Sequence, residues 1–163
     1  MPGKKTDKHR YWLTFLLPDL PTAAVFKPGA LHITVIPWFV VEMDEAELLE
    51  SFSKTFGQLQ AFDVRVGETA MLGPDRDVSV NLIEEVPGIM QLQGLALDWM
   101  RQLGARWAVK QPHVGSEYIP HVRRRLGLSM AQGARLRLDH LTLVEALRAE
   151  DGQRRVAGKV TFE

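Results

Sequence analysis

The pattern of apolar and polar residues predicts short β-strands interrupted by two amphipathic helices. Apolar residues recur at helical spacing between Asp44 and Gly57, and again between Pro87 and Gly104. This spacing predicts a helix with one buried face in each segment. Other segments are rich in aromatic and β-branched residues and end at turn-forming residues, as strands do. The predicted strands cover residues 11–17, 31–36, 62–72, 78–83, 118–123, 136–146 and 155–162.

The order of these elements predicts an α+β fold. Two strands and a helix are followed by two strands and a helix, and then by three strands. A doubly wound parallel sheet would alternate strands and helices throughout. The length of 163 residues fits one domain, and no linker-like segment divides it. We expect a basic tail over residues 1–9 and a single domain over residues 10–163.

Composition narrows the classes of function. The chain has no cysteine, which excludes disulfides, thiolate catalysis and zinc–thiolate sites. It carries 20 basic and 20 acidic side chains, so no global attraction to a long nucleic acid is expected. A nucleotide or an RNA end suits this balance better. No segment approaches the roughly 20 apolar residues of a membrane span. We therefore expect a cytoplasmic protein without membrane contact, and a monomer.

Two predicted strands each carry a histidine with a polar residue two positions later. His32 is followed by Thr34, and His121 is followed by Arg123. Residues i and i+2 of a strand share a face, so each pair projects together. Two imidazoles can act as a base and an acid without a metal. A hydroxyl or guanidinium beside each ring can hold phosphate oxygens. The pattern therefore indicates phosphoryl chemistry.

These segments resemble the motifs of the 2H phosphoesterase superfamily, also called the 2′-5′ RNA ligase-like family. His32-Ile33-Thr34 is similar to its first H-x-T/S motif, and Pro120-His121-Val122 is similar to its second. The resemblance spans nearly the whole chain. It implies a bilobal fold, with two antiparallel β-sheets lining a central groove and two outer helices.

The same resemblance implies an activity. Family members hydrolyse 2′,3′-cyclic phosphates, or 2′-5′ and cyclic oligonucleotide phosphodiester bonds, and some ligate 2′-5′ RNA. His32 and His121 would be catalytic, and Thr34 and Arg123 would bind phosphate. The implied partner is a nucleotide or RNA end carrying a cyclic or 2′-linked phosphate, and no cofactor is expected.

Arg123 departs from the family pattern, which has Thr or Ser two residues after the second histidine. An arginine can grip phosphate through two N–H groups, but it is much larger than a hydroxyl side chain. The alternative function is therefore a binding module that holds a nucleotide or RNA end without turnover.

Other residues offer further candidates. His140-Leu141-Thr142 is a literal H-x-T and an alternative second motif, although it follows the family's expected position. No metal site is expected, because no H-E-x-x-H occurs and no two histidines lie four residues apart on a predicted helix. Substrate contacts are expected from four residues, for which packing or solvent exposure is the alternative role: Tyr118, Trp38, Arg125 and His113.

Overall fold

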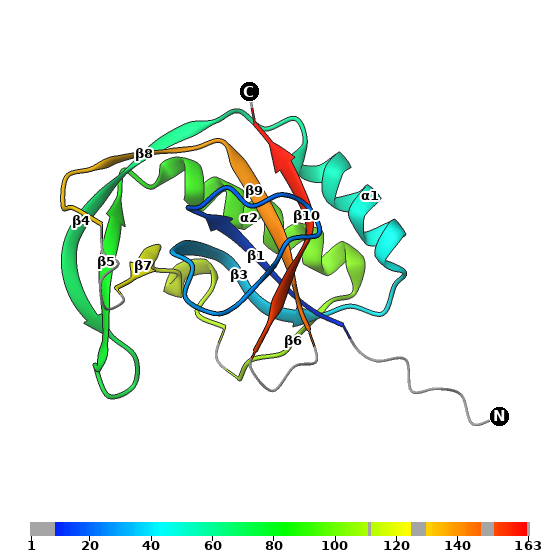
Figure 1. Cartoon of the computed structure of the whole chain (residues 1–163), viewed down its shortest axis with the longest axis horizontal. Coiled ribbons are helices and arrows are strands. Elements are labelled where there is room, and N and C mark those ends of the chain that lie inside the picture. Colours follow the sequence, from blue (N-terminus) through cyan, green and yellow to red (C-terminus); the bar gives the residue numbers. More distant parts are fainter. Residues whose placement is uncertain (1–8, 111, 125–129, 148–151, 163) are drawn as a thin grey trace.

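A computed structural model describes residues 9–110, 112–124, 130–147 and 152–162 (Figure 1). Nearly all of the expected tail over residues 1–9 lies outside this range, as does Arg125. Among the described residues, no helix is long and apolar enough to cross a membrane.

The described residues form two α-helices, one 3₁₀ helix and ten strands. The helices are α1 (Glu45–Phe56), α2 (Pro87–Leu103) and the 3₁₀ helix η1 (Gly115–Glu117). The strands are β1 (Arg10–Leu16), β2 (Val25–Phe26), β3 (His32–Val40), β4 (Phe62–Leu72), β5 (Val78–Glu84), β6 (Arg106–Trp107), β7 (His121–Arg123), β8 (Arg135–Leu138), β9 (His140–Ala146) and β10 (Arg154–Thr161).

The strands join into a single antiparallel sheet. Their order is β2-β10-β9-β1-β3-β7-β5-β4-β8, and β6 pairs with β3. Its two halves meet where β3 pairs with β7, through the register Ile33 with Val122. The α+β prediction is confirmed, and the two expected sheets are the two halves of this one path. Each half is an antiparallel set of strands, as the resemblance implied.

Both helices pack on one face of the sheet, over the main hydrophobic core. The Trp99 ring of α2 lies about perpendicular to the rings of Phe39 and Phe56 and is tilted against that of Phe52. Its indole N–H donates to the Ser51 hydroxyl of α1 over 2.9 Å. Because Trp99 is fully buried, these contacts fix both helices against β3, on the face opposite the smaller apolar cluster.

This second face of the sheet carries the smaller apolar cluster. Trp12, Leu16, Val144 and Val156 form it, and the segment between β1 and β3 packs against it. The Ala23 N–H donates to the backbone oxygen of Val156, and the Val156 N–H donates to that of Ala24, so this segment is bound to β10. In Figure 1 the same segment crosses in front of β9 and β10, while α2 lies behind the sheet.

Some predicted boundaries were wrong. The expected strand over 136–146 is broken at Asp139, because β8 pairs with β4 in one half and β9 pairs with β1 and β10 in the other. The expected strand over 118–123 is only β7, since η1 ends just before Tyr118 and Pro120 has no N–H to give to a ladder. The expected loop over 105–117 contains β6 and η1.

Candidate functional site

The two histidine motifs lie side by side at the junction of the two halves of the sheet. Ile33 and Val122 are register partners, and both are buried in the main core. Successive side chains of a strand point to opposite faces. The residues flanking each of them, His32 with Thr34 and His121 with Arg123, therefore project from the other face, away from the helices.

The register also sets which residues of the two motifs are neighbours. One step from the Ile33–Val122 pair, Thr34 lies across from His121, and His32 lies across from Arg123. His32 and His121 are thus diagonal neighbours, a relation in which backbones are about 7–8 Å apart and long side chains come within reach. Both imidazoles are half-buried.

Both histidines are held by the same local hydrogen bond. Nδ1 of His32 lies 2.8 Å from the carbonyl oxygen of Ala30, and Nδ1 of His121 lies 2.7 Å from that of Ile119. A carbonyl oxygen only accepts, so Nδ1 must carry the proton in each ring. In a neutral ring Nε2 is then the nitrogen that takes up a proton. Sequence reasoning missed these bonds, which depend on the backbone two residues before each histidine.

Thr34 is oriented by a neighbour on β1. The indole N–H of Trp12 donates to Oγ1 of Thr34 over 3.1 Å. With Oγ1 accepting this bond, the Thr34 hydroxyl proton is directed elsewhere. The ring of Trp12 also meets the ring of His32 edge to face, with 4.4 Å between centroids. Trp12 is 4% exposed, so its side chain is held in place beside the first motif.

Two polar side chains, the half-buried Tyr118 and the buried Gln93, connect the segments that carry the motifs. The Tyr118 hydroxyl donates to the backbone oxygen of Thr34 over 2.7 Å, and burial raises the pKa of this phenol. Gln93 of α2 donates to the oxygen of Val35 and accepts from the N–H of Gly115, both over 3.0 Å. The hydroxyl of Tyr118, which was expected to contact the substrate, therefore binds a backbone oxygen of β3. Gln93, which the sequence analysis missed, links β3 with η1, and we call these two side chains braces.

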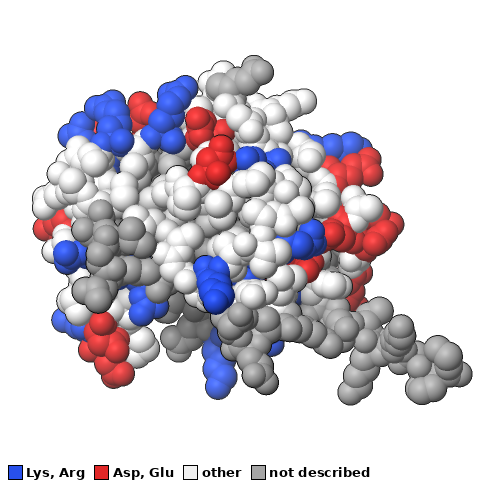
Figure 2. Space-filling view, viewed as in Figure 1, with Lys and Arg blue, Asp and Glu red and all other residues white. Residues whose placement is uncertain are grey.

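The remaining candidates have separate surroundings. Arg123 is exposed and lies across from Val80 of β5. His113 is exposed, with its ring 3.9 Å from the Glu117 carboxylate. Trp38 packs against Trp12, with 5.5 Å between ring centroids. Figure 2 shows a surface that is mostly uncharged in this view, with most of the charged side chains toward its margins.

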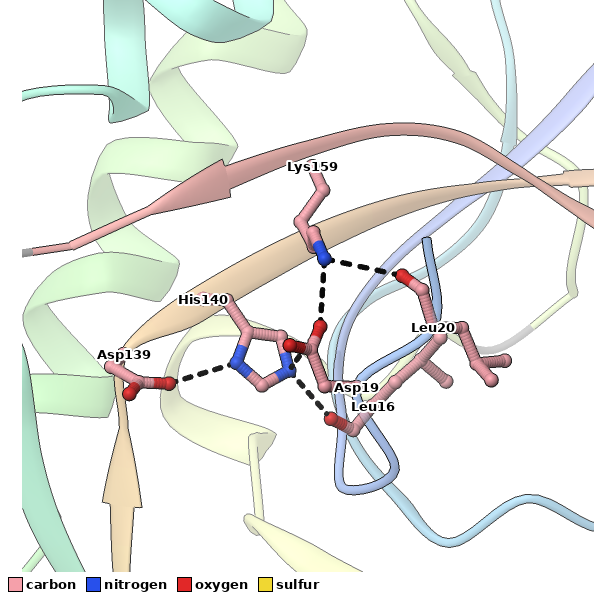
Figure 3. A network of polar contacts seen from close by, with 6 residues as sticks. All are labelled: Leu16, Asp19, Leu20, Asp139, His140 and Lys159. Carbon is pink, nitrogen blue, oxygen red and sulfur yellow. Dashed lines mark hydrogen bonds and ion pairs between the residues drawn. The ribbon is translucent and has the colours of Figure 1, made fainter. Parts of the chain in front are cut away.

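His140 belongs to a different network (Figure 3). Its Nδ1 lies 2.8 Å from the Asp139 carboxylate, and its Nε2 lies 2.9 Å from the oxygen of Leu16. Lys159 binds Asp19 over 2.7 Å next to this ring, and this contact lowers the pKa of the Asp19 carboxyl. His140 thus ties β9 to the end of β1 through Nε2, while its Nδ1 is held by the side chain of the preceding residue. Thr142, the other residue of the alternative motif, is 1% exposed.

No group of three or more histidine, aspartate or glutamate side chains that could hold a metal gathers among the described residues. The chemistry that the side chains of His32, Thr34, His121 and Arg123 offer is proton transfer and anion binding.

Comparison with known proteins gives matches in structure only. No protein-family model matches the chain, and no curated protein matches it significantly. TT0787 of Thermus thermophilus has a TM-score of 0.62 at 16% identity, over 94% of this chain and 97% of that one. A structure described as a phosphoesterase has a TM-score of 0.61 at 12% identity, over 96% and 99%. E. coli LigT complexed with 3′-AMP has a TM-score of 0.60 at 14% identity, over 96% and 99%. The likeness covers nearly the whole of each chain, and this chain therefore shares its fold with TT0787, with the structure described as a phosphoesterase and with LigT.

Proposed function

We propose that this protein is a metal-independent phosphodiesterase that cleaves a 2′,3′-cyclic phosphate, or a 2′-5′ or cyclic oligonucleotide phosphodiester bond. The observation that carries the proposal is the diagonal placement of His32 and His121, each with Nδ1 on a backbone carbonyl. Solved LigT structures hold 3′-AMP, ATP, NADP⁺ and phosphate, which supports a nucleotide as the ligand.

For a 2′,3′-cyclic phosphate, the reaction needs one base and one acid. Nε2 of one neutral histidine takes a proton from water, and the water oxygen attacks phosphorus. The bond from phosphorus to the 3′ oxygen breaks, and the second histidine, protonated, gives its Nε2 proton to that oxygen. The product is a 2′-phosphate, and the proton taken from water balances the one delivered. Because Nδ1 of each ring is bound to its own backbone carbonyl, Nε2 is the reactive nitrogen in both. The two histidines can therefore exchange the roles of acid and base when the reaction runs in the opposite direction.

Thr34 and Arg123 bind the phosphate in this scheme. Oγ1 of Thr34 accepts a hydrogen bond from the Trp12 indole. The Thr34 hydroxyl can therefore donate its own proton to a non-bridging phosphate oxygen. The register of β3 and β7 sets Arg123 across from His32, and its guanidinium can donate two parallel hydrogen bonds to the same phosphate. Donors of this kind stabilise charge that builds on the oxygens in the transition state.

The test is hydrolysis of 2′,3′-cyclic nucleotides and cyclic oligonucleotides by His32→Ala and His121→Ala, with and without a chelator. Loss of a general acid or base lowers rates by about 10²–10⁴-fold, and each variant should fall by at least that much while it stays folded. His9→Ala is the control, because the His9 side chain is 56% exposed and precedes β1, away from the two motifs in the sequence. Full activity in either motif variant would remove that histidine from the mechanism, and inhibition by the chelator would contradict metal independence.

The exposed Arg123 supports a second candidate, a module that binds a nucleotide or RNA end without turnover. In that case the wild-type protein binds 3′-AMP or a cyclic nucleotide in calorimetry and releases no product. Binding that is lost in His32→Ala, with no hydrolysis of any cyclic substrate by the wild type, would favour the module over the enzyme.

A further inference from the structure

Strand β5 places apolar side chains beside the second histidine. Leu82 is the register partner of His121, and directly opposed residues of an antiparallel pair share a face of the sheet. Leu82 is half-buried, so part of its side chain is open on that face. The N–H of Ile83 donates to the backbone oxygen of Pro120 over 3.0 Å, which extends the pairing and sets Ile119 on the face of His121. Because Ile119 is 49% exposed, it adds to the apolar surface that Leu82 begins.

A carboxylate lies at the far end of this apolar surface. Glu84 comes two residues after Leu82 on β5 and shares its face. The ladder between β4 and β5 is irregular here, with residues 67 and 68 of β4 both across from Leu82, as in a β-bulge. The Glu84 side chain lies over the backbone of Gly67, since a Cβ on Gly67 would be 2.8 Å from its Cγ and 2.9 Å from its Oε1. The carboxylate is therefore next to Leu82, on the side away from His121.

The Glu84 carboxylate keeps its acceptors for a ligand. Glu84 is exposed, and it has no hydrogen bond or ion pair with any other residue that the structure describes. Arg65, its register partner on β4, pairs instead with Glu85 over 3.4 Å. An ionised carboxylate only accepts hydrogen bonds, so a ligand at Glu84 must present donors. Two donors side by side fit its two oxygens best.

The parts of this surface lie in one line across the sheet. β7, β5 and β4 are neighbours in that order (Figure 1). Adjacent strands are about 4.8 Å apart, so the backbones of His121 and Gly67 are about 10 Å apart. A nucleotide with its phosphate at His121 can cover Leu82 with its base and turn the Watson–Crick edge, which is remote from the ribose, toward Glu84. An apolar lining with a polar group at one end is the usual construction of a small-molecule site.

We propose that Leu82, Ile119 and Glu84 form a guanine subsite for the nucleotide whose phosphate lies at the two histidines. The proposal rests on the proposed function and names its substrate class, a guanosine carrying a cyclic or 2′-linked phosphate. Guanine presents two adjacent donors, N1–H and N2–H, on its Watson–Crick edge, and the two oxygens of Glu84 can accept both. Adenine and cytosine place a ring nitrogen acceptor beside their amino group, and uracil flanks its one N–H with two carbonyl oxygens, so each of them sets an acceptor against the carboxylate.

The experiment compares kcat/KM for the 2′,3′-cyclic phosphates of guanosine, inosine and adenosine. A hydrogen bond to a charged group is worth roughly tenfold to a hundredfold. The wild type should therefore prefer guanosine to adenosine at least about tenfold, with inosine between them because it has N1–H and lacks the 2-amino group.

Two variants and a control test the role of Glu84 in this preference. Glu84→Gln replaces one acceptor with a donor and should lower the ratio of guanosine to adenosine at least about tenfold. Gly67→Ala keeps the carboxylate and should also lower the ratio, because the added Cβ would be 2.9 Å from Oε1 and must displace it. Glu47→Gln should leave the ratio unchanged, because Glu47 is exposed on α1, which packs on the opposite face of the sheet.

Equal kcat/KM values for guanosine and adenosine in the wild type would overturn the guanine subsite and leave the proposed function standing. A preference that persists in Glu84→Gln would overturn the assignment to Glu84. If the wild type turns over none of the three, the proposed function fails, and calorimetry with 3′-GMP, 3′-IMP and 3′-AMP tests the subsite alone. Tighter binding of 3′-GMP that Glu84→Gln abolishes supports the subsite, and equal affinities in the wild type refute it.

Discussion

Gln93 is a buried polar residue of α2 whose side chain connects the strand of the first histidine motif with the segment before the second. Its amide donates to the oxygen of Val35, one residue after Thr34, and accepts from the N–H of Gly115, at the start of η1. Replacing Gln93 with Leu keeps a side chain of similar size and removes both hydrogen bonds. We expect this change to lower both stability and activity.

The size of the stability loss follows from the burial of the groups left behind. An unpaired buried donor or acceptor costs about 1–3 kcal/mol. The oxygen of Val35 is in the buried environment, whereas Gly115 is half-buried and can reach water. We therefore expect a loss of about 2–4 kcal/mol in the free energy of unfolding, most of it from Val35. For a chain of this size each kcal/mol lowers Tm by about 2–4 °C.

The activity loss is expected from displacement of His121 relative to His32. A misplacement of about 1 Å can cost on the order of a hundredfold in rate, and kcat should fall more than KM changes, because the histidines act in the chemical step. Urea denaturation gives the stability, and steady-state kinetics well below Tm gives kcat and KM. Gln91→Leu is the matched control, since Gln91 is exposed two residues earlier on the same helix, and it should stay within about 0.5 kcal/mol of wild type.

Two results would refute this reasoning. Unchanged stability in Gln93→Leu would mean that the two hydrogen bonds are worth little. A stability loss of the expected size with unchanged kcat would show that Gln93 supports the fold and does not position the motifs.

Further predictions concern Arg123 and the two tyrosines. Arg123→Thr restores the family's second motif, and it should lower phosphodiesterase activity if Arg123 binds the phosphate; a gain of activity would favour the binding module. Burial raises the pKa of both Tyr11 and Tyr118, the only tyrosines of the chain, and the Glu45 and Glu145 charges add to the shift at Tyr11. Tyrosine in the unfolded chain ionises at about pH 10. Above that pH the unfolded state loses protons that the folded state keeps, so the free energy of unfolding falls as the pH rises, and below that pH these two groups cause no loss. Spectrophotometric titration should show little tyrosinate in the folded protein at about pH 11, and a midpoint near the ordinary value would contradict the burial.

Local pattern in the sequence predicted which residues face which side, but it could not predict which strands are neighbours. Alternation within residues 31–36 placed His32 and Thr34 together on one face, which the buried Ile33 between them bears out. That β3 pairs with β7, and that β5 sets Leu82 beside His121, depends on the order of the whole sheet. The family resemblance implied two antiparallel sheets lining a central groove, but nothing in the sequence analysis supplied either of these pairings.

Gln93 did leave a signal in the sequence that was not used. It lies four residues after Ile89 and three before Ala96, within the apolar stripe that predicted α2. A polar residue on the core face of a helix needs a buried partner, and a glutamine there indicates a backbone segment that leaves hydrogen bonds unpaired. The bonds from His32 and His121 to carbonyls two residues earlier left no such signal, because any residue type supplies a carbonyl.

The placement of the site at the junction of the two halves explains why side-chain braces matter to it. β3 and β7 share one register pair, Ile33 with Val122, whereas β3 is paired with β1 along most of its length. A ladder this short fixes the distance between the halves weakly, since each added pair would contribute hydrogen bonds and side-chain contacts. Tyr118 and Gln93 supply the missing connections at Thr34 and Val35. The separation of the two imidazoles thus depends on hydrogen bonds outside the sheet, and loss of either brace should affect catalysis more than loss of an equally buried core contact in β9 or β10.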